Sequence, residues 1–137
     1  MRFVDTNILL YAISTDSAEA GKAQRANEIL TYRDLALSVQ VLQEFYVQAT
    51  RQGRPDALTG EQAGELVESF MRFPVAPLTT AVMQAAFTTQ QRWRISYWDA
   101  AIIEAARALG CGTVLSEDLA DGADYGGILV QNPFSGL

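Results

Sequence analysis

The chain opens with Met1-Arg2-Phe3-Val4-Asp5-Thr6-Asn7-Ile8-Leu9-Leu10, in which an aspartate directly follows a short apolar segment. That segment, residues 2–4, predicts a β-strand. Ligands of open parallel sheets bind beyond the carboxyl ends of the strands, so Asp5 at a strand exit marks a candidate catalytic position. Thr6 or Asn7 would then cap the next helix. The alternative interpretation is that Asp5 is only an N-cap or turn residue.

Short β-like segments alternate with longer segments of helical period along the chain, which predicts a parallel sheet covered by helices on both faces. The expected architecture is α/β, with three layers and a central, mostly parallel sheet of four or five strands. The expected strands are residues 2–4, 35–37, 75–78, 113–115 and 128–130. The expected helices are residues 6–14, 18–32, 39–51, 59–73, 80–93 and 97–109.

Helix-start signals support these assignments. Ser38 is a natural N-cap, and Thr59 followed by Gln62 has the spacing of a capping box. Ser96 followed by Asp99 resembles a second capping box.

Length and composition predict one domain, residues 1–137, with a core that needs no metal or disulfide for folding. The single cysteine, Cys111, excludes an internal disulfide and fits a reducing compartment. No apolar segment reaches the length of a membrane span, and the N-terminus lacks the pattern of a signal peptide. We therefore expect a soluble, cytoplasmic protein that does not contact a membrane.

The chain contains no histidine, which excludes catalysis and metal binding by imidazole. Sixteen acids against ten bases give a net charge of −6, the wrong sign for binding nucleic acid by bulk electrostatics. A nucleic-acid substrate would need bound cations and local basic patches. The candidates for phosphate contacts lie near the ends of two predicted helices, where the helix dipole alone also explains them: Arg51, Arg54, Arg92 and Arg94.

Four acids are expected at one edge of the predicted sheet. Asp5 and Asp118 follow strands, Asp99 lies in the first turn of a helix, and Glu44 lies in the second turn of another. Converging carboxylates repel one another, and a hard divalent cation relieves that repulsion. Convergence would therefore imply Mg²⁺ or Mn²⁺, which can polarise a phosphodiester and activate water without a histidine.

Each acid also has a purely structural explanation. Asp99 would complete the capping box with Ser96, although its apolar neighbours make a lone carboxylate costly to bury there. Glu44 would lie on a solvated helix face, and Asp118 would belong to a solvated acidic loop.

With these acids located, the sequence resembles the PIN-domain ribonucleases, and more narrowly the VapC-type toxins of bacterial toxin–antitoxin pairs. The matching segments run nearly from end to end: Phe3-Val4-Asp5-Thr6-Asn7-Ile8-Leu9-Leu10-Tyr11, Gln43-Glu44-Phe45, Tyr97-Trp98-Asp99-Ala100-Ala101-Ile102-Ile103, Leu115-Ser116-Glu117-Asp118-Leu119 and Asn132-Pro133-Phe134.

The resemblance implies an Mg²⁺- or Mn²⁺-dependent endoribonuclease that cleaves single-stranded or loop RNA with metal-activated water. It implies that the acids corresponding to Asp5, Glu44, Asp99 and Asp118 are the catalytic metal ligands. Three neighbouring residues would orient the ligands or the metal-bound waters: Thr6, Asn7 and Ser116. Asp121 would be an accessory ligand among these surrounding residues. The resemblance also implies a homodimer and a cognate antitoxin that blocks the site.

Two other interpretations compete with this one. Phosphoryl-transfer enzymes of the haloacid-dehalogenase type also place an aspartate after the first strand, but they require a second aspartate where this chain has Asn7. They also need a lysine at a later strand end, whereas the only lysine here is Lys22, in an early helix. The second alternative is a non-catalytic PIN-like module that binds RNA or a partner, and retention of all four acids argues against it.

Overall fold

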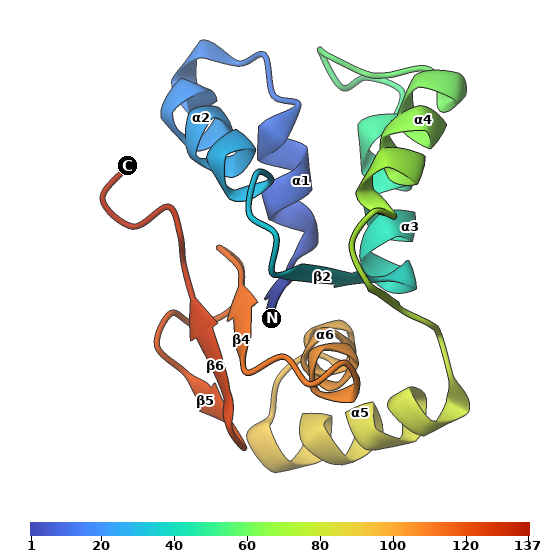
Figure 1. Cartoon of the computed structure of the whole chain (residues 1–137), viewed down its shortest axis with the longest axis vertical. Helices are drawn as coiled ribbons and strands as arrows, with labels where there is room; N and C mark the ends of the chain where they lie inside the picture. The colour runs from blue at the N-terminus through green and yellow to red at the C-terminus, as the bar shows by residue number, and fades with distance from the viewer.

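A six-stranded, mostly parallel sheet lies between two groups of helices (Figure 1). The computed structural model describes all of residues 1–137. The strands are β1 (Arg2–Val4), β2 (Leu35–Ser38), β3 (Val75–Ala76), β4 (Thr113–Leu115), β5 (Asp124–Tyr125) and β6 (Ile128–Gln131). The helices are α1 (Thr6–Ala12), η1 (Ser17–Glu19, a 3-10 turn), α2 (Ala20–Ile29), α3 (Val39–Ala49), α4 (Gly60–Phe70), α5 (Thr80–Trp93) and α6 (Tyr97–Ala108). None of the helices is long and apolar enough to cross a bilayer.

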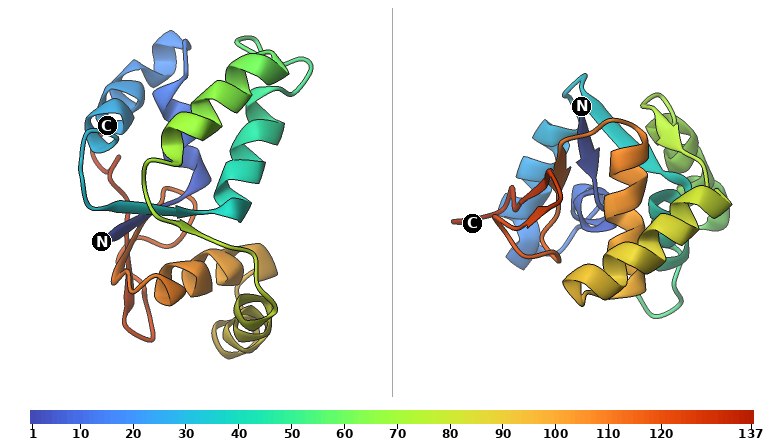
Figure 2. Two further views of the ribbon diagram at one scale, coloured as in Figure 1. Left: turned by 45° about the vertical axis from the view of Figure 1, so that its right-hand side comes forward. Right: turned by 90° about the horizontal axis from the view of Figure 1, so that it is seen from below.

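The strand order β3-β2-β1-β4-β6-β5 explains the two helical layers. The chain moves outward from β1 through β2 to β3, and then returns past β1 to β4. Because parallel crossovers are right-handed, reversing the direction of travel moves the connecting helices to the other face of the sheet. Helices α1 to α4 accordingly lie on one face, and α5 and α6 lie on the other (Figures 1 and 2). The reversal occurs between β1 and β4, which makes their carboxyl ends the expected ligand crevice.

The predicted α/β architecture is confirmed, and every predicted helix and strand is present. The sheet has one strand more than expected, because the two residues of β5 pair antiparallel with β6. A two-residue strand within a glycine-rich loop carries no periodic signal. Several helices end two or three residues earlier than predicted, and the first turn of the second helix forms η1 instead.

Side-chain caps fix the starts of α3 and α4. Ser38 Oγ accepts a hydrogen bond from the backbone N–H of Val41, as predicted for an N-cap. The capping box of Thr59 and Gln62 is complete, with both reciprocal bonds formed. These caps satisfy backbone donors that the first turn of a helix leaves unpaired.

The core packs on both faces of the central strands. Phe3 and Val4 of β1 are fully buried, and all four residues of β2 are buried, as expected for parallel strands covered on both faces. On the α3 side, the ring of Phe45 meets that of Phe70 from α4 edge to face, with 5.2 Å between centroids. This contact fixes the two-helix unit α3–α4 that carries Glu44.

Replacing Phe45 by alanine should therefore cost about 3–5 kcal/mol of unfolding free energy, because the residue is fully buried and a cavity would remain. Urea denaturation measures this change. The matched control is Val47→Ala on the same helix, which is 57% exposed and should lose less than about 1 kcal/mol. Equal losses in the two variants would contradict the assignment of α3 to the core.

Candidate active site

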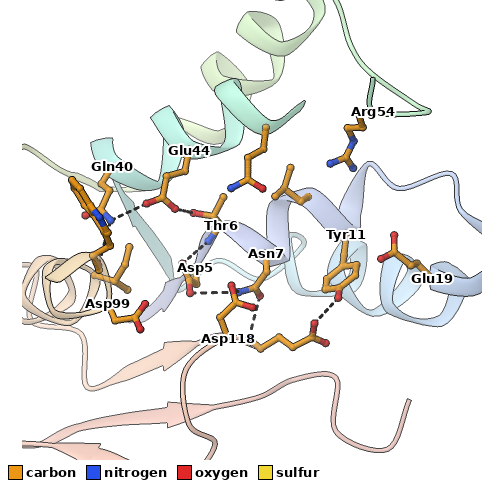
Figure 3. A pocket seen from close by; sticks show the side chains of 15 residues that line it. Asp5, Thr6, Asn7, Tyr11, Glu19, Gln40, Glu44, Arg54, Asp99 and Asp118 are labelled. Carbon is orange, nitrogen blue, oxygen red and sulfur yellow. Dashed lines mark hydrogen bonds between the residues drawn. The ribbon is translucent and has the colours of Figure 1, made fainter. Parts of the chain in front are cut away.

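A cavity of about 360 Å³ opens at the carboxyl ends of β1 and β4, and all four predicted acids line it (Figure 3). Its acidic and amide walls come from segments that are far apart in the sequence. The polar residues on its wall include Asp5, Thr6, Asn7, Glu19, Gln40, Glu44, Gln48, Arg54, Asp99, Glu117 and Asp118.

Asp5 lies at the centre of this arrangement and is only 6% exposed. Strands β1 and β4 pair in register, Val4 opposite Leu115, so the next residues, Asp5 and Ser116, are neighbours. The Asp5 carboxylate accepts bonds from Thr6 N at 2.7 Å and from Ser116 Oγ at 2.7 Å. Asp5 itself is the N-cap of α1, so the expectation that Thr6 or Asn7 caps this helix is wrong. The cap and the cavity acid are the same residue.

Asn7 and Ser116 join the two strand exits. Asn7 Nδ2 donates to Asp118 Oδ2 at 3.2 Å and to Asp5 Oδ2 at 3.4 Å, so one amide serves both acids. Asn7 Oδ1 accepts from Glu117 N, while Ser116 Oγ accepts from Asp118 N. Asn7 and Ser116, two of the residues predicted to orient the acids, are therefore in contact with them.

Glu44 reaches the cavity from α3 and is held by two donors. Thr6 Oγ1 donates to its Oε2 at 2.7 Å, and Gln40 Nε2 donates to its Oε1 at 2.9 Å. Gln40 is 7% exposed and also donates to the carbonyl oxygen of Trp98 at 3.3 Å. The sequence analysis did not single out Gln40, although its position four residues before Glu44 places both on one face of α3.

Asp99 lies in the first turn of α6, on the other side of the sheet, and forms only half of the predicted capping box. Its backbone N–H donates to Ser96 Oγ at 3.0 Å, but its carboxylate does not bond the backbone N–H of Ser96 in return. The carboxylate is thus available to the cavity.

The acids perturb one another across the cavity. Burial is the main cause that raises the pKa of Asp5, and the charges of Asp118 and Glu44 add to it, whereas the bonds from Ser116 and Thr6 lower it; the net pKa is about 6. Burial likewise raises the pKa of Asp99, with a further increase from Asp118 and Glu44. Each of these two acids therefore lies in the electrostatic field of Asp118 and Glu44.

The donor set fits a hard divalent cation, since carboxylate oxygens are what Mg²⁺ and Mn²⁺ prefer. In this structure no three or more acidic or thiol side chains are arranged as a ready metal-ligand group. Asp5 and Asp118 are instead bridged by the Asn7 amide.

Of the predicted accessory ligand and the four predicted phosphate contacts, only one residue lies at the cavity. Arg54 lines the cavity and pairs with Asp56 at 2.7 Å. Asp121 does not line it and accepts bonds from Asn132 N and Ser135 Oγ, which fix the C-terminal turn. Three arginines also lie outside the cavity lining: Arg51, Arg92 and Arg94.

A second hydrogen-bonded cluster, which the sequence did not predict, holds Glu117 in the segment after β4. Tyr11 Oη donates to Glu117, and Lys22 Nζ donates to Glu117 Oε2 at 2.6 Å. Burial raises the pKa of Glu117, but these bonds outweigh it and hold the pKa below its usual value. The only lysine of the chain thus neutralises the acid next to Asp118. No local pattern links residues 11, 22 and 117.

Comparison with known proteins gives the class of this protein. The PIN-domain family model matches residues 2–120, so the chain belongs to the PIN-domain family. No curated protein sequence matches the chain.

Several solved structures share the fold at low sequence identity. A toxin–antitoxin complex from Klebsiella pneumoniae aligns at TM-score 0.72 and 18% identity, over 98% of each chain. VapC20 of Mycobacterium tuberculosis, described as a toxin that cleaves the sarcin–ricin loop, aligns at TM-score 0.66 and 19% identity, over 86% of this chain and 90% of that one. DNA-bound VapBC from Salmonella typhimurium aligns at TM-score 0.67 and 18% identity, over 96% and 97%.

The raised pKa of Asp5 makes stability depend on pH in a defined direction. Between the ordinary value of 3.8 and about 6, the folded protein binds more protons than the unfolded chain, so stability falls as the pH rises through this window. The two pKa values differ by the equivalent of about 3 kcal/mol. Urea denaturation in EDTA, from about pH 4 to about pH 7.5, should therefore show Asp5→Asn gaining stability relative to the wild type as the pH rises. A difference that stays constant or shrinks with pH would contradict the buried position of the carboxylate.

Proposed function

We propose that this protein is an Mg²⁺- or Mn²⁺-dependent endoribonuclease that acts as the toxin of a toxin–antitoxin pair. The observation that carries the proposal is the single cavity lined by Asp5, Glu44, Asp99 and Asp118, four acids from separate elements. Membership of the PIN-domain family and the shared fold of toxin structures support the same function.

Asp5 and Asp99 are the proposed principal metal ligands, and Glu44 and Asp118 complete the set. When bound, the cation would polarise the phosphodiester and lower the pKa of water. The residues around the acids orient them: Thr6 donates to Glu44, Ser116 donates to Asp5, and Asn7 donates to Asp118. Since every one of these side-chain bonds is donated to a carboxylate oxygen, they favour the ionised acids. With no histidine in the chain, the proton of the attacking water passes to a carboxylate or to solvent.

The proposed partners are an RNA substrate, a cognate antitoxin and a second copy of the chain. Structures of relatives described as toxin–antitoxin complexes support the antitoxin partner. Of the four predicted basic residues, only Arg54 lines the cavity, which supports it as the proposed contact to an RNA phosphate. Such weak positive charge means that bound cations would carry most of the phosphate contact.

Asp5→Asn and Asp99→Asn should each abolish cleavage of RNA, because each removes a charged ligand from the cavity. The assay incubates purified protein with total bacterial RNA and Mg²⁺ or Mn²⁺, with an EDTA control. Discrete fragments should appear with the wild type. In EDTA and in both variants the rate of cleavage should fall at least about 100-fold, below detection.

The matched control is Glu65→Gln, which removes one exposed acid of α4 away from the cavity and should cleave like the wild type. Retained cleavage in either aspartate variant, with an unchanged circular dichroism spectrum, would refute the site. RNA binding without cleavage under any metal would favour the non-catalytic PIN-like module instead.

A further inference from the structure

Trp98 is the most exposed large hydrophobic residue of the chain, with 65% of its surface accessible. It precedes Asp99 in the first turn of α6 and lines the carboxylate cavity. It also lines a neighbouring cavity of about 350 Å³, whose wall is mostly apolar and includes Leu78, Met83 and Tyr97. An indole exposed at the junction of an acidic and an apolar cavity is a candidate contact for a ligand that has both a charged and an aromatic part.

The indole packs against Tyr97, and the backbone of Trp98 is hydrogen-bonded to a residue of the acidic wall. The ring of Tyr97 meets it edge to face at 5.0 Å between centroids, and Phe87 of α5 packs against Tyr97 at 5.5 Å. The carbonyl oxygen of Trp98 accepts from Gln40, the residue that also holds Glu44. The backbone of Trp98 is therefore held by the glutamine that also holds Glu44, so the indole starts from a fixed point beside the acidic wall.

Charge supplies little affinity for RNA at this cavity. The chain carries a net charge of −6, and Arg54, the only arginine of the cavity wall, is already paired with Asp56. Figure 3 shows Arg54 on the opposite side of the cavity from Gln40, so no guanidinium lies beside the Trp98 end. Stacking on an aromatic ring binds any unpaired base without needing positive charge.

We propose that Trp98 stacks on the nucleobase beside the phosphodiester that is cleaved. A base in a duplex is stacked on both faces and offers no free ring surface to the indole. The proposal rests on the proposed function, because it names the nucleotide contact that would place the phosphate over Asp5 and Asp99.

Fluorescence tests the contact without cleavage. The chain has two tryptophans, and Trp93, which packs on Tyr125 at 5.6 Å, does not line the cavity. In Trp93→Phe with Asp5→Asn, which should not cleave, titration with a ten-nucleotide single-stranded RNA in Mg²⁺ should quench the Trp98 emission, and a blunt duplex of the same sequence should not. Trp98→Ala should weaken binding of the single strand about 5- to 100-fold, while Trp98→Phe should restore most of it. Equal quenching by both RNAs, or none, would overturn the proposal.

Kinetics separate this proposal from the proposed function. In the otherwise wild-type protein with Mg²⁺, Trp98→Ala should raise KM with little change in kcat, and Trp93→Ala should change neither. Unchanged KM in Trp98→Ala, with cleavage intact, would overturn the stacking contact and leave the nuclease standing. Quenching without any cleavage would support the contact and overturn the nuclease. If Trp98→Ala instead changes the molecular mass in sedimentation and leaves RNA binding unchanged, Trp98 belongs to a protein interface and the proposal fails.

Discussion

The buried carboxylate of Asp5 is the constraint on which the rest of the site depends. A carboxylate with 6% exposure is stable only if donors surround it. Those donors, Thr6 N and Ser116 Oγ, exist because β1 and β4 pair in register and end together at the reversal of strand order. One topological feature thus fixes the acid, the start of α1 and the loop that carries Asp118.

The buried acids of the cavity lower the stability of the folded protein when they are ionised. Raised pKa values at Asp5 and Asp99 mean that their ionised forms are disfavoured by burial and by neighbouring acids. Natural cores avoid such groups, whereas active sites collect them because a cation or a substrate supplies the missing counter-charge. Glu117, on the same cavity wall, differs from these acids because Lys22 of the protein itself supplies its counter-charge.

The sequence predicts the elements and the acids better than the contacts between them. Alternating periodicity and caps at Ser38 and Thr59 locate the helices, and strand exits locate Asp5 and Asp118, because these signals are local. The strand β5 is too short to show a period, and whether Asp5 or Thr6 caps α1 depends on backbone geometry. Lys22 could not be assigned to the site because its partner Glu117 meets it only in the folded chain, whereas the spacing of Gln40 and Glu44 on one helix face was a local signal that could have found Gln40.

The most direct test of the account is the anomalous scattering of Mn²⁺ in crystals of the wild-type protein. If these acids hold a cation, an anomalous peak should lie inside the cavity of Figure 3, within coordination distance of the Asp5 and Asp99 carboxylates. That peak should disappear in crystals of Asp5→Asn grown under the same conditions. A fully soaked crystal with no peak there, or with its peaks only at surface acids outside the cavity, would contradict the central claim that these acids form a metal centre.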